Sequence, residues 1–200
     1  MKRFLESLRI QRWDDHRYYH QSRINQTLHL FSALSFLIAY VMLLTDPVVA
    51  SLVGWLVAMT LRQAGHFFFE PKGYDHVNDA THDHKERIKV GYNLRRKVVL
   101  LSIWVAIPLV LLLDKDAYGM LDHYDGGYLR RVGLLWLGLG VAGLVLRTLY
   151  LCLARGAETG FVWMAKILTD PFHDVKLYYK APFHLMRGEL IDPMPHARQG

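Results

Sequence analysis

Apolar positions in this 200-residue chain fall into long blocks that are separated by polar segments. The block at 24–61 contains one acidic residue, Asp46, and no lysine or arginine, and the blocks at 98–113 and 132–146 contain no charged residue. The first block is divided at Asp46-Pro47, because proline interrupts a helical pattern, so the chain offers four apolar runs. These runs are apolar on every side, whereas a surface helix of a soluble protein keeps a polar stripe.

The length of the runs is close to what a membrane requires. A transmembrane helix needs roughly 20 apolar residues, with about 17 as the lower limit. Three runs fall slightly short on a strict charge-free count, but flanking Lys and Arg can snorkel and Tyr and Trp can anchor at the interface. We therefore predict an all-α integral membrane bundle of about four transmembrane helices. The alternative is an all-α soluble bundle with very apolar core helices.

The polar and apolar blocks divide a single membrane domain into five parts. Hydrophobic residues make up 52% of the chain, near the top of the soluble range, which fits this alternation. The N-terminus is basic but lacks the apolar region and cleavage pattern of a signal peptide, so the first span would serve as an uncleaved insertion signal. The expected parts are an N-terminal surface helix at 1–23, a transmembrane hairpin at 24–61, a polar histidine-rich loop at 62–97, a second transmembrane pair at 98–154 and a C-terminal interfacial segment at 155–200.

The distribution of basic residues predicts an orientation. Six Lys and Arg residues precede the first span and eight lie at 62–97, whereas the opposite loop at 114–131 has three. The positive-inside rule then places both termini and the central loop in the cytoplasm, at a bacterial inner membrane or the endoplasmic reticulum. The net charge of +6 favours anionic lipid head groups or acidic substrates. A nucleic-acid partner is not expected, because the sequence has no aromatic-basic RNA motif.

The stretch "HRYYHQSRINQTLH" contains three histidines: His16 and His20 precede the first span, and His29 lies within it. His20 and His29 are nine residues apart, so on one continuous helix they would face opposite directions. We predict a break near Ser22 to Thr27, with Ser22, Asn25 or Thr27 capping the new helix. Such a break would let both rings converge on one site.

A second polar stripe ends the second span, in "LRQAGHFFFE". Gln63, His66 and Glu70 lie at i, i+3 and i+7, and Gly65 allows another helix to approach closely. Because the first two spans form a hairpin, His66 can meet His29. Imidazole with carboxylate suits iron or zinc, and histidine is a ligand only when neutral. The alternative is that the two histidines hydrogen-bond across the hairpin or lie at the head-group layer.

Further histidines gather in the other polar segments. The loop "YDHVNDATHDHKE" contains His76, His82 and His84, which could complete a site, form the shell of a second metal, or belong to a solvated loop. In the C-terminal segment, His173 and Asp174 could reach the site or have a structural or interfacial role. We expect this segment to pack over the site.

The paired motifs resemble a known family. "YHQSRINQTLH", "QAGHFFFE", their order and the apolar hairpin between them look like the membrane 2-hydroxy fatty acid dioxygenase family, whose fungal members act in phytosphingosine breakdown. The resemblance covers about residues 16–113. It implies an Fe(II)-dependent α-oxidation, in which dioxygen cleaves a 2-hydroxy fatty acid to a fatty acid one carbon shorter.

The resemblance also implies roles for individual residues. Three histidines match those of the family, namely His20, His29 and His66, and three other motif positions are matched by Asn25, Gln63 and Glu70. We take the second set as catalytic candidates and the histidines as metal ligands, with the loop histidines as further ligand candidates. The chain departs from the family after Glu70, where a longer, charged and histidine-rich segment replaces a short link.

The expected function is therefore an Fe(II)-dependent membrane oxygenase, with a lipid or fatty acid and dioxygen as substrates and one iron per chain preferred over two. A di-iron lipid hydroxylase or desaturase is the first alternative, although the tight H-x-x-H-H clusters usual in those enzymes are absent. A non-catalytic membrane scaffold or transporter is the second. A transporter should place ionisable residues within its spans, and the middles of these spans have none.

Overall fold

The computed structural model describes residues 2–70, 72–90 and 94–194, and the regular secondary structure of these residues is helical. This confirms the all-α prediction. The helices in chain order are α1 (Lys2–Tyr19), α2 (Arg23–Met42), α3 (Pro47–Val53), the π-helix η1 (Gly54–Met59), α4 (Thr60–Ala64), the π-helix η2 (Gly65–Phe69), α5 (His82–Ile88), α6 (Leu94–Leu113), α7 (Tyr128–Arg155), α8 (Ala157–Tyr178) and α9 (Ala181–Met186).

Four helical stretches of the described chain are long and apolar enough to cross a membrane. They are Arg23–Met42, Pro47–Phe69, Arg95–Leu113 and Tyr128–Arg155. In the third stretch only 6% of the apolar window is buried inside the protein, so its side chains face outward as those of a lipid-contacting helix do. The four stretches agree with the four predicted spans and are consistent with an integral membrane protein.

The second span is one rod made of α3, η1, α4 and η2. Asp46 caps its start, because the carboxylate Oδ1 accepts hydrogen bonds from the backbone N–H groups of Val48 and Val49 at 3.1 and 3.2 Å. Pro47 occupies the first turn, where its missing N–H has no cost. The Asp-Pro pair that divides the apolar block in the sequence therefore begins a helix here. The π-helical turns are uncommon and often occur at functional sites.

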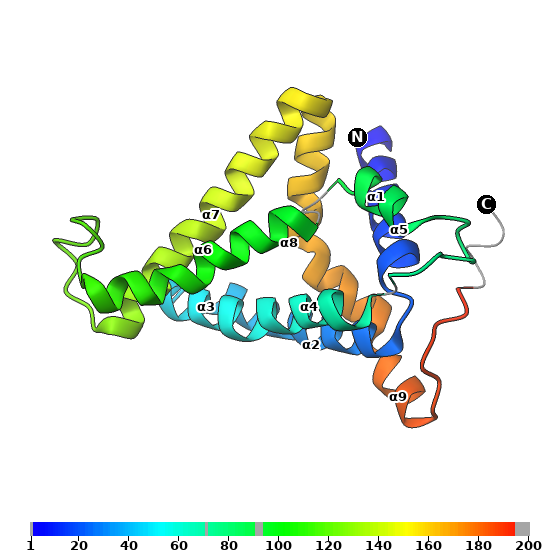
Figure 1. The fold of residues 1–200 in the computed structure, drawn as a ribbon, viewed down its shortest axis with the longest axis horizontal. Helices are drawn as coiled ribbons and strands as arrows, with labels where there is room; N and C mark the ends of the chain where they lie inside the picture. The colour runs from blue at the N-terminus through cyan, green and yellow to red at the C-terminus, as the bar shows by residue number, and fades with distance from the viewer. Residues whose placement is uncertain (1, 71, 91–93, 195–200) are drawn as a thin grey trace.

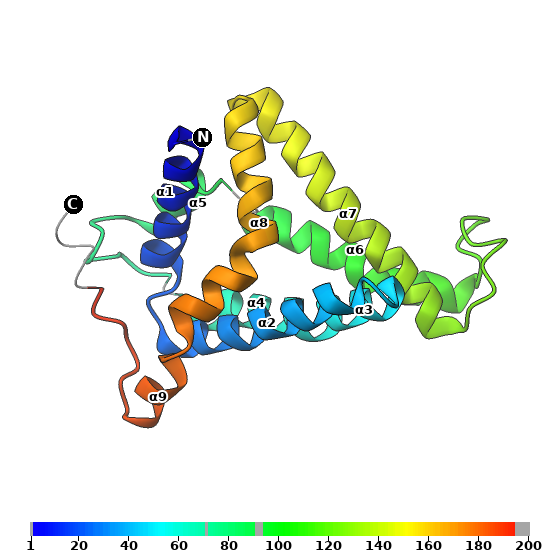
Figure 2. The ribbon, with the colours of Figure 1, turned by 180° about the vertical axis from the view of Figure 1, so that it is seen from behind.

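The helices form a three-sided arrangement (Figures 1 and 2). The hairpin of α2 and the second span forms one side, α6 and α7 lean away from its closed end, and α8 returns from the tip of α7 to cross its open end. Helices α1, α5 and α9 gather at this open end, and the loop that joins α6 and α7 lies at the opposite end. The open end of the hairpin is therefore the place where segments distant in sequence meet.

Three tryptophans join the second span to α6 and α7. The ring centroids of Trp55 and Trp104 are 6.2 Å apart, and those of Trp104 and Trp136 are 5.4 Å apart. The indole N–H of Trp55 donates to the carbonyl of Trp136 at 2.8 Å, and that of Trp136 donates to the carbonyl of Trp104 at 2.9 Å. Each aromatic pair contributes about 0.5–1.5 kcal/mol beyond its buried area. This stack holds α6 and α7 against the second span of the hairpin.

The C-terminal segment that was expected at 155–200 is largely helical, and α8 alone contributes 22 residues to it. Lys166 of α8 lies 2.5 Å from Asp15 of α1 and 2.6 Å from Asp170, so α8 is tied to α1. Burial lowers the pKa of Lys166, but the two carboxylates outweigh it and raise the pKa above its ordinary value. Residues 195–200, with His196, lie outside the described part of the chain.

Candidate metal centre

A sharp elbow separates α1 from α2 and places His20 between them. The α2 helix begins after Ser22, whose hydroxyl accepts a hydrogen bond from the backbone N–H of Asn25 at 3.4 Å. The side-chain amide of Asn25 donates to the carbonyl of Tyr19 at 2.8 Å and holds the elbow in place. The predicted break is confirmed, with Ser22 as its cap.

The residues after α9 fasten the same elbow from outside. The backbone N–H of Arg23 donates to the carbonyl of Leu190 at 2.9 Å, and that of Asp192 donates to the carbonyl of Gln21 at 2.8 Å. Arg23 also pairs with the carboxylate of Asp192 at 3.0 Å. The C-terminal segment therefore packs beside the site, as expected.

Gly65 lets the two helical arms of the hairpin approach each other closely at the site. A Cβ atom added to Gly65 would lie 2.1 Å from the Asn25 side-chain oxygen and 3.4 Å from Cδ2 of His29. Only glycine fits at 2.1 Å, since carbon and oxygen need about 3 Å or more. The next residue, His66, consequently meets His29, with ring centroids 4.9 Å apart.

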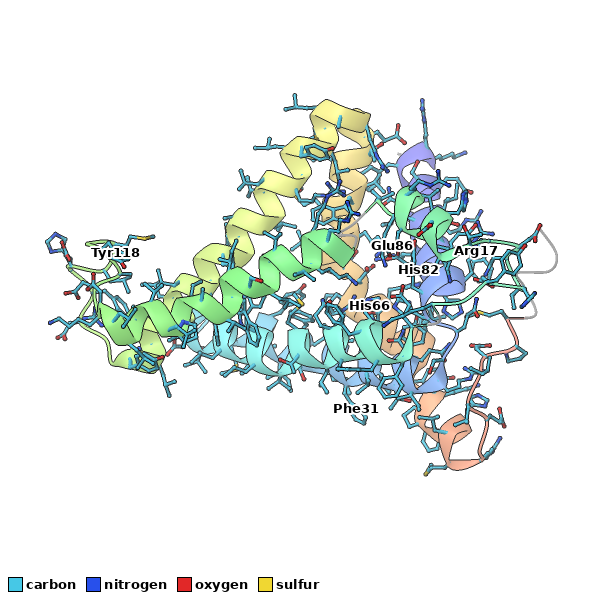
Figure 3. The ribbon with its side chains drawn as sticks, in the orientation of Figure 1. Arg17, Phe31, His66, His82, Glu86 and Tyr118 are labelled. Carbon is cyan, nitrogen blue, oxygen red and sulfur yellow. The ribbon has the colours of Figure 1, made fainter. Side chains whose placement is uncertain are left out.

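Three histidine rings converge at this end of the hairpin. The ring centroid of His20 lies 4.1 Å from that of His29 and 5.2 Å from that of His66. One ring nitrogen from each residue lies within 4.8 Å of the other two. Metal–nitrogen bonds of about 2.1 Å place ligating nitrogens roughly 3–3.5 Å apart, so a small inward movement of the rings would seat an ion. Figure 3 shows His66 at the end of the hairpin that lies toward α1 and α5, and Tyr118 at the far end of the molecule.

Two of the rings are oriented through Nδ1 by a neighbouring polar group. Nδ1 of His66 lies 2.7 Å from the Glu70 carboxylate, and Nδ1 of His20 lies 3.1 Å from the hydroxyl of Tyr178. Nε2 of His20 is buried without a hydrogen-bond partner. Histidines that bind metals commonly use one nitrogen for the ion and the other for such an orienting contact. The arrangement therefore leaves Nε2 for a cation.

His29 is the most unusual member of the group. Its side chain is fully buried, yet neither ring nitrogen has a hydrogen-bond partner. Nδ1 lies 3.7 Å from the carboxylate of Asp174, which makes a short contact with Arg62. Leaving a buried polar atom unpaired costs about 1–3 kcal/mol. A cation bound between the three rings would satisfy one of these nitrogens, so the residues fit a metal ion.

Tyr178 connects the cluster to a fourth histidine. Its hydroxyl lies 3.1 Å from Nδ1 of His20 and 3.1 Å from Nδ1 of His16, and a single hydroxyl proton can serve only one of them. If His20 binds a metal through Nε2, its Nδ1 carries the proton and donates to Tyr178, which then donates to His16. Burial lowers the pKa of His16 to about 4 and holds the pKa of His20 well below its usual value, so both rings are neutral at pH 7.

The three catalytic candidates take different places. Asn25 is fully buried and holds the elbow, with its side-chain oxygen against Gly65. The side-chain amide of Gln63 faces the sulfur of Met59 at 3.2 Å, and Gln63 borders a cavity. Glu70 orients His66 rather than joining the three rings. Burial raises the pKa of Glu70 above its ordinary value, against the charges of the nearby lysines.

The three loop histidines do not join the cluster. His76 and His84 are exposed, and the ring of His76 contacts Tyr74 with centroids 5.0 Å apart. His82 is half-buried at the start of α5. Among the described residues, the group close enough to hold one ion is that of His20, His29 and His66.

The polar face of α8 is a part of the site that the prediction from sequence does not include. That prediction assigns Tyr178 no role and gives Asp174 as a residue that could reach the site or have a structural or interfacial role. A signal was present, because Lys166, Asp170, Asp174 and Tyr178 follow one another at intervals of four and so share one helix face. A buried polar face on a helix has to meet polar partners, which here are α1 and the histidine cluster.

Comparison with known proteins adds nothing to this description: no family model matches the chain, and neither a curated protein nor a solved structure is detectably similar to it.

Proposed function

We propose that this protein is a metal-dependent membrane oxygenase that acts on a lipid, with Fe(II) held by His20, His29 and His66. The observation that carries the proposal is the convergence of three imidazoles, of which those of His20 and His66 are oriented through Nδ1, while Nε2 of His20 and Nε2 of His29 are buried without a hydrogen-bond partner. The specific reaction that we propose is the one implied by the family resemblance, the oxidative shortening of a 2-hydroxy fatty acid by one carbon.

The chemistry of the donor set supports iron. When bound, Fe(II) supplies open coordination positions and reducing electrons for reaction with dioxygen, and three neutral imidazoles leave such positions free. The protein itself orients the histidine rings and excludes water from around them. Glu70 and Tyr178 fix the direction of two rings, and the burial of His20 and His29 excludes water from their side of the site.

The position of the cluster supports a lipid substrate. It lies at the end of the hairpin formed by the first two candidate spans, next to the polar segments. An amphiphile presents its carboxyl group at this depth of a membrane while its tail stays among apolar helices. The distribution of basic residues further supports an orientation with this end, and both termini, in the cytoplasm.

The same geometry favours one ion per chain over the di-iron alternative. A second ion needs several more ligands, and the loop histidines that could supply them lie apart from the cluster. The unpaired nitrogens of His29 favour a metal site over interfacial histidines, because a histidine at a wet interface would find water as a partner.

The test is metal analysis and product analysis of detergent-purified protein loaded anaerobically with Fe(II). We expect one iron per chain, and a fatty acid one carbon shorter after exposure to a 2-hydroxy fatty acid and air. Two irons per chain would support the di-iron alternative. Iron binding with a different oxidised lipid product would refute only the specific reaction, and a protein that binds no transition metal would overturn the whole proposal.

A further inference from the structure

A cavity of about 270 Å³ lies inside the three-sided arrangement, between α1, α4, α6, α7 and α8. Small-molecule pockets begin at roughly 300 Å³, and protein interiors otherwise leave few voids larger than a water molecule. Much of its wall is apolar, contributed by Trp55, Leu100, Leu139, Leu144 and Trp163. His66 also borders the cavity, so one wall belongs to the candidate metal centre.

The charged residues around the cavity are mostly neutralised within the protein. Asp14 pairs with Arg17 at 2.8 Å. Three bordering cations have carboxylate partners: Arg62 pairs with Asp174, Lys89 with Glu70 and Glu86, and Lys166 with Asp15 and Asp170. These groups leave little net charge for a ligand to recognise.

Lys97 is different. It borders the cavity from the first turns of α6, and no carboxylate of the described residues lies within 4.0 Å of its ammonium group. It is close enough to the metal centre for its charge, like that of Lys89, to act on Glu70. An ammonium group that borders an apolar cavity and has no described carboxylate within 4.0 Å can be paired by an anion from outside the chain.

We propose that the cavity binds a single-chain anionic amphiphile, with the anionic head on Lys97 and the chain along the wall formed by Trp55 and Leu139. This inference deepens the proposed function, because a ligand held here would lie against His66; its role as the substrate rests on that function, but its binding does not. The lysine and the apolar wall together select a ligand with one anionic head group and one apolar chain. A long-chain carboxylate and a long-chain phosphate monoester both meet this description.

Binding is measured by quenching of tryptophan fluorescence with dibromostearate, because Trp55 and Trp163 border the cavity. The protein is kept metal-free with a chelator in detergent micelles, so that a failure of iron binding does not affect the result. We expect saturable quenching by dibromostearate and little specific quenching by its uncharged methyl ester. Competition by stearate and by a long-chain alkyl phosphate distinguishes the two head groups.

The lysine is tested by Lys97→Gln, with Lys97→Arg as the charge-retaining control. We expect Lys97→Gln to weaken dibromostearate binding about tenfold, as expected for the loss of one charge-assisted hydrogen bond, and Lys97→Arg to retain it. Equal affinity in wild type and a folded Lys97→Gln variant would overturn the assignment of the anion to Lys97.

The apolar chain is tested by reducing the cavity volume. A Cβ atom on Gly140 would lie 3.7 Å from Nε1 of Trp55, an ordinary contact, so Gly140→Leu fills the cavity without a backbone clash. Gly138→Leu on the same helix is the matched control, because a Cβ there meets nothing within 4 Å. We expect saturable quenching to disappear in the first variant and persist in the second. Unchanged quenching in folded Gly140→Leu protein would show that the chain binds elsewhere and overturn the proposal.

Discussion

The hydroxyl of Tyr178 lies 3.1 Å from Nδ1 of His20, although 158 residues separate the two in the chain. Tyr178 comes from the last turn of α8 and His20 from the elbow before α2. Leu30 of α2 and Ala181 of α9 pack against Tyr178 in one small buried cluster. The end of α8 therefore packs against α2 and contacts the His20 ring at the same time.

Removing this hydroxyl should weaken metal binding while the fold remains. Tyr178→Phe keeps the ring and its packing but leaves Nδ1 of His20 without its orienting partner. Loss of such a contact typically costs 10- to 100-fold in metal affinity, which titration of Fe(II) or Zn(II) against a competing chelator would measure. Tyr179→Phe is the matched control, because Tyr179 is exposed. Equal affinity in the two variants would contradict the role of Tyr178.

Gly65→Ala should separate the two helices that carry His29 and His66. The new methyl group would overlap the Asn25 side chain, and we expect a loss of about 1–3 kcal/mol in stability together with the loss of bound metal. Thermal unfolding and metal analysis would report the two effects. Gly54→Ala is the control in the same span, since its Cβ would lie 3.8 Å from the Phe36 ring. Retention of a full complement of metal in Gly65→Ala protein would show that the close approach is unnecessary.

Alanine substitutions should distinguish the proposed ligand histidines from the loop histidines by their effect on metal content. His29→Ala and His66→Ala each remove one of the three convergent rings, so the bound ion should be lost. His76→Ala and His84→Ala alter exposed side chains outside the cluster and should leave the metal content unchanged. Metal analysis of the four purified variants makes the comparison. Loss of metal in a loop variant would mean that the site extends beyond the three rings.

Stability of the metal-free protein should fall in mild acid. Burial lowers the pKa of His16 from about 6.5 to about 4, so the folded protein holds this ring neutral while the unfolded chain protonates it. The contribution is complete above about pH 6.5 and declines as the pH falls toward 4, where it is lost, with a total on the order of 3 kcal/mol. Unfolding temperatures measured between these pH values should show the decline. His16→Gln should make the decline less steep without abolishing it, because burial also lowers the pKa of His20. An unchanged slope in that variant would assign the effect to other groups.

Much of the fold could be predicted from contiguous patterns. The apolar runs predict four spans and the structure contains four such helices, with the interruption at Asp46-Pro47 becoming a helix cap. The elbow was predicted because His20 and His29 could not share a face on one helix, and Ser22 caps the new helix there. The close approach at Gly65 followed from the hairpin. Each of these predictions depends only on residues that are close in sequence or on the tight turn that joins the first two spans.

The membership of the cluster was harder to predict. In the sequence His76, His82 and His84 look as suitable as His20, since all lie in polar segments beside apolar spans. The structure brings His20 to the cluster and leaves the loop histidines outside it. The difference arises from how the loop packs, which residue type and spacing alone do not encode.

By itself, then, the sequence determined the helical class, the four apolar spans and the end of the hairpin at which His29 and His66 gather. Only the tertiary structure determined that Tyr178 of α8 contacts His20 and that Asp174 lies beside His29. It also determined that Lys97 and His66 border the same cavity. The physical reason is that helix periodicity and apolarity are local properties of the chain. Which polar side chains become partners depends on how helices more than a hundred residues apart pack to bury their apolar faces, and the polar groups buried with them must then satisfy one another.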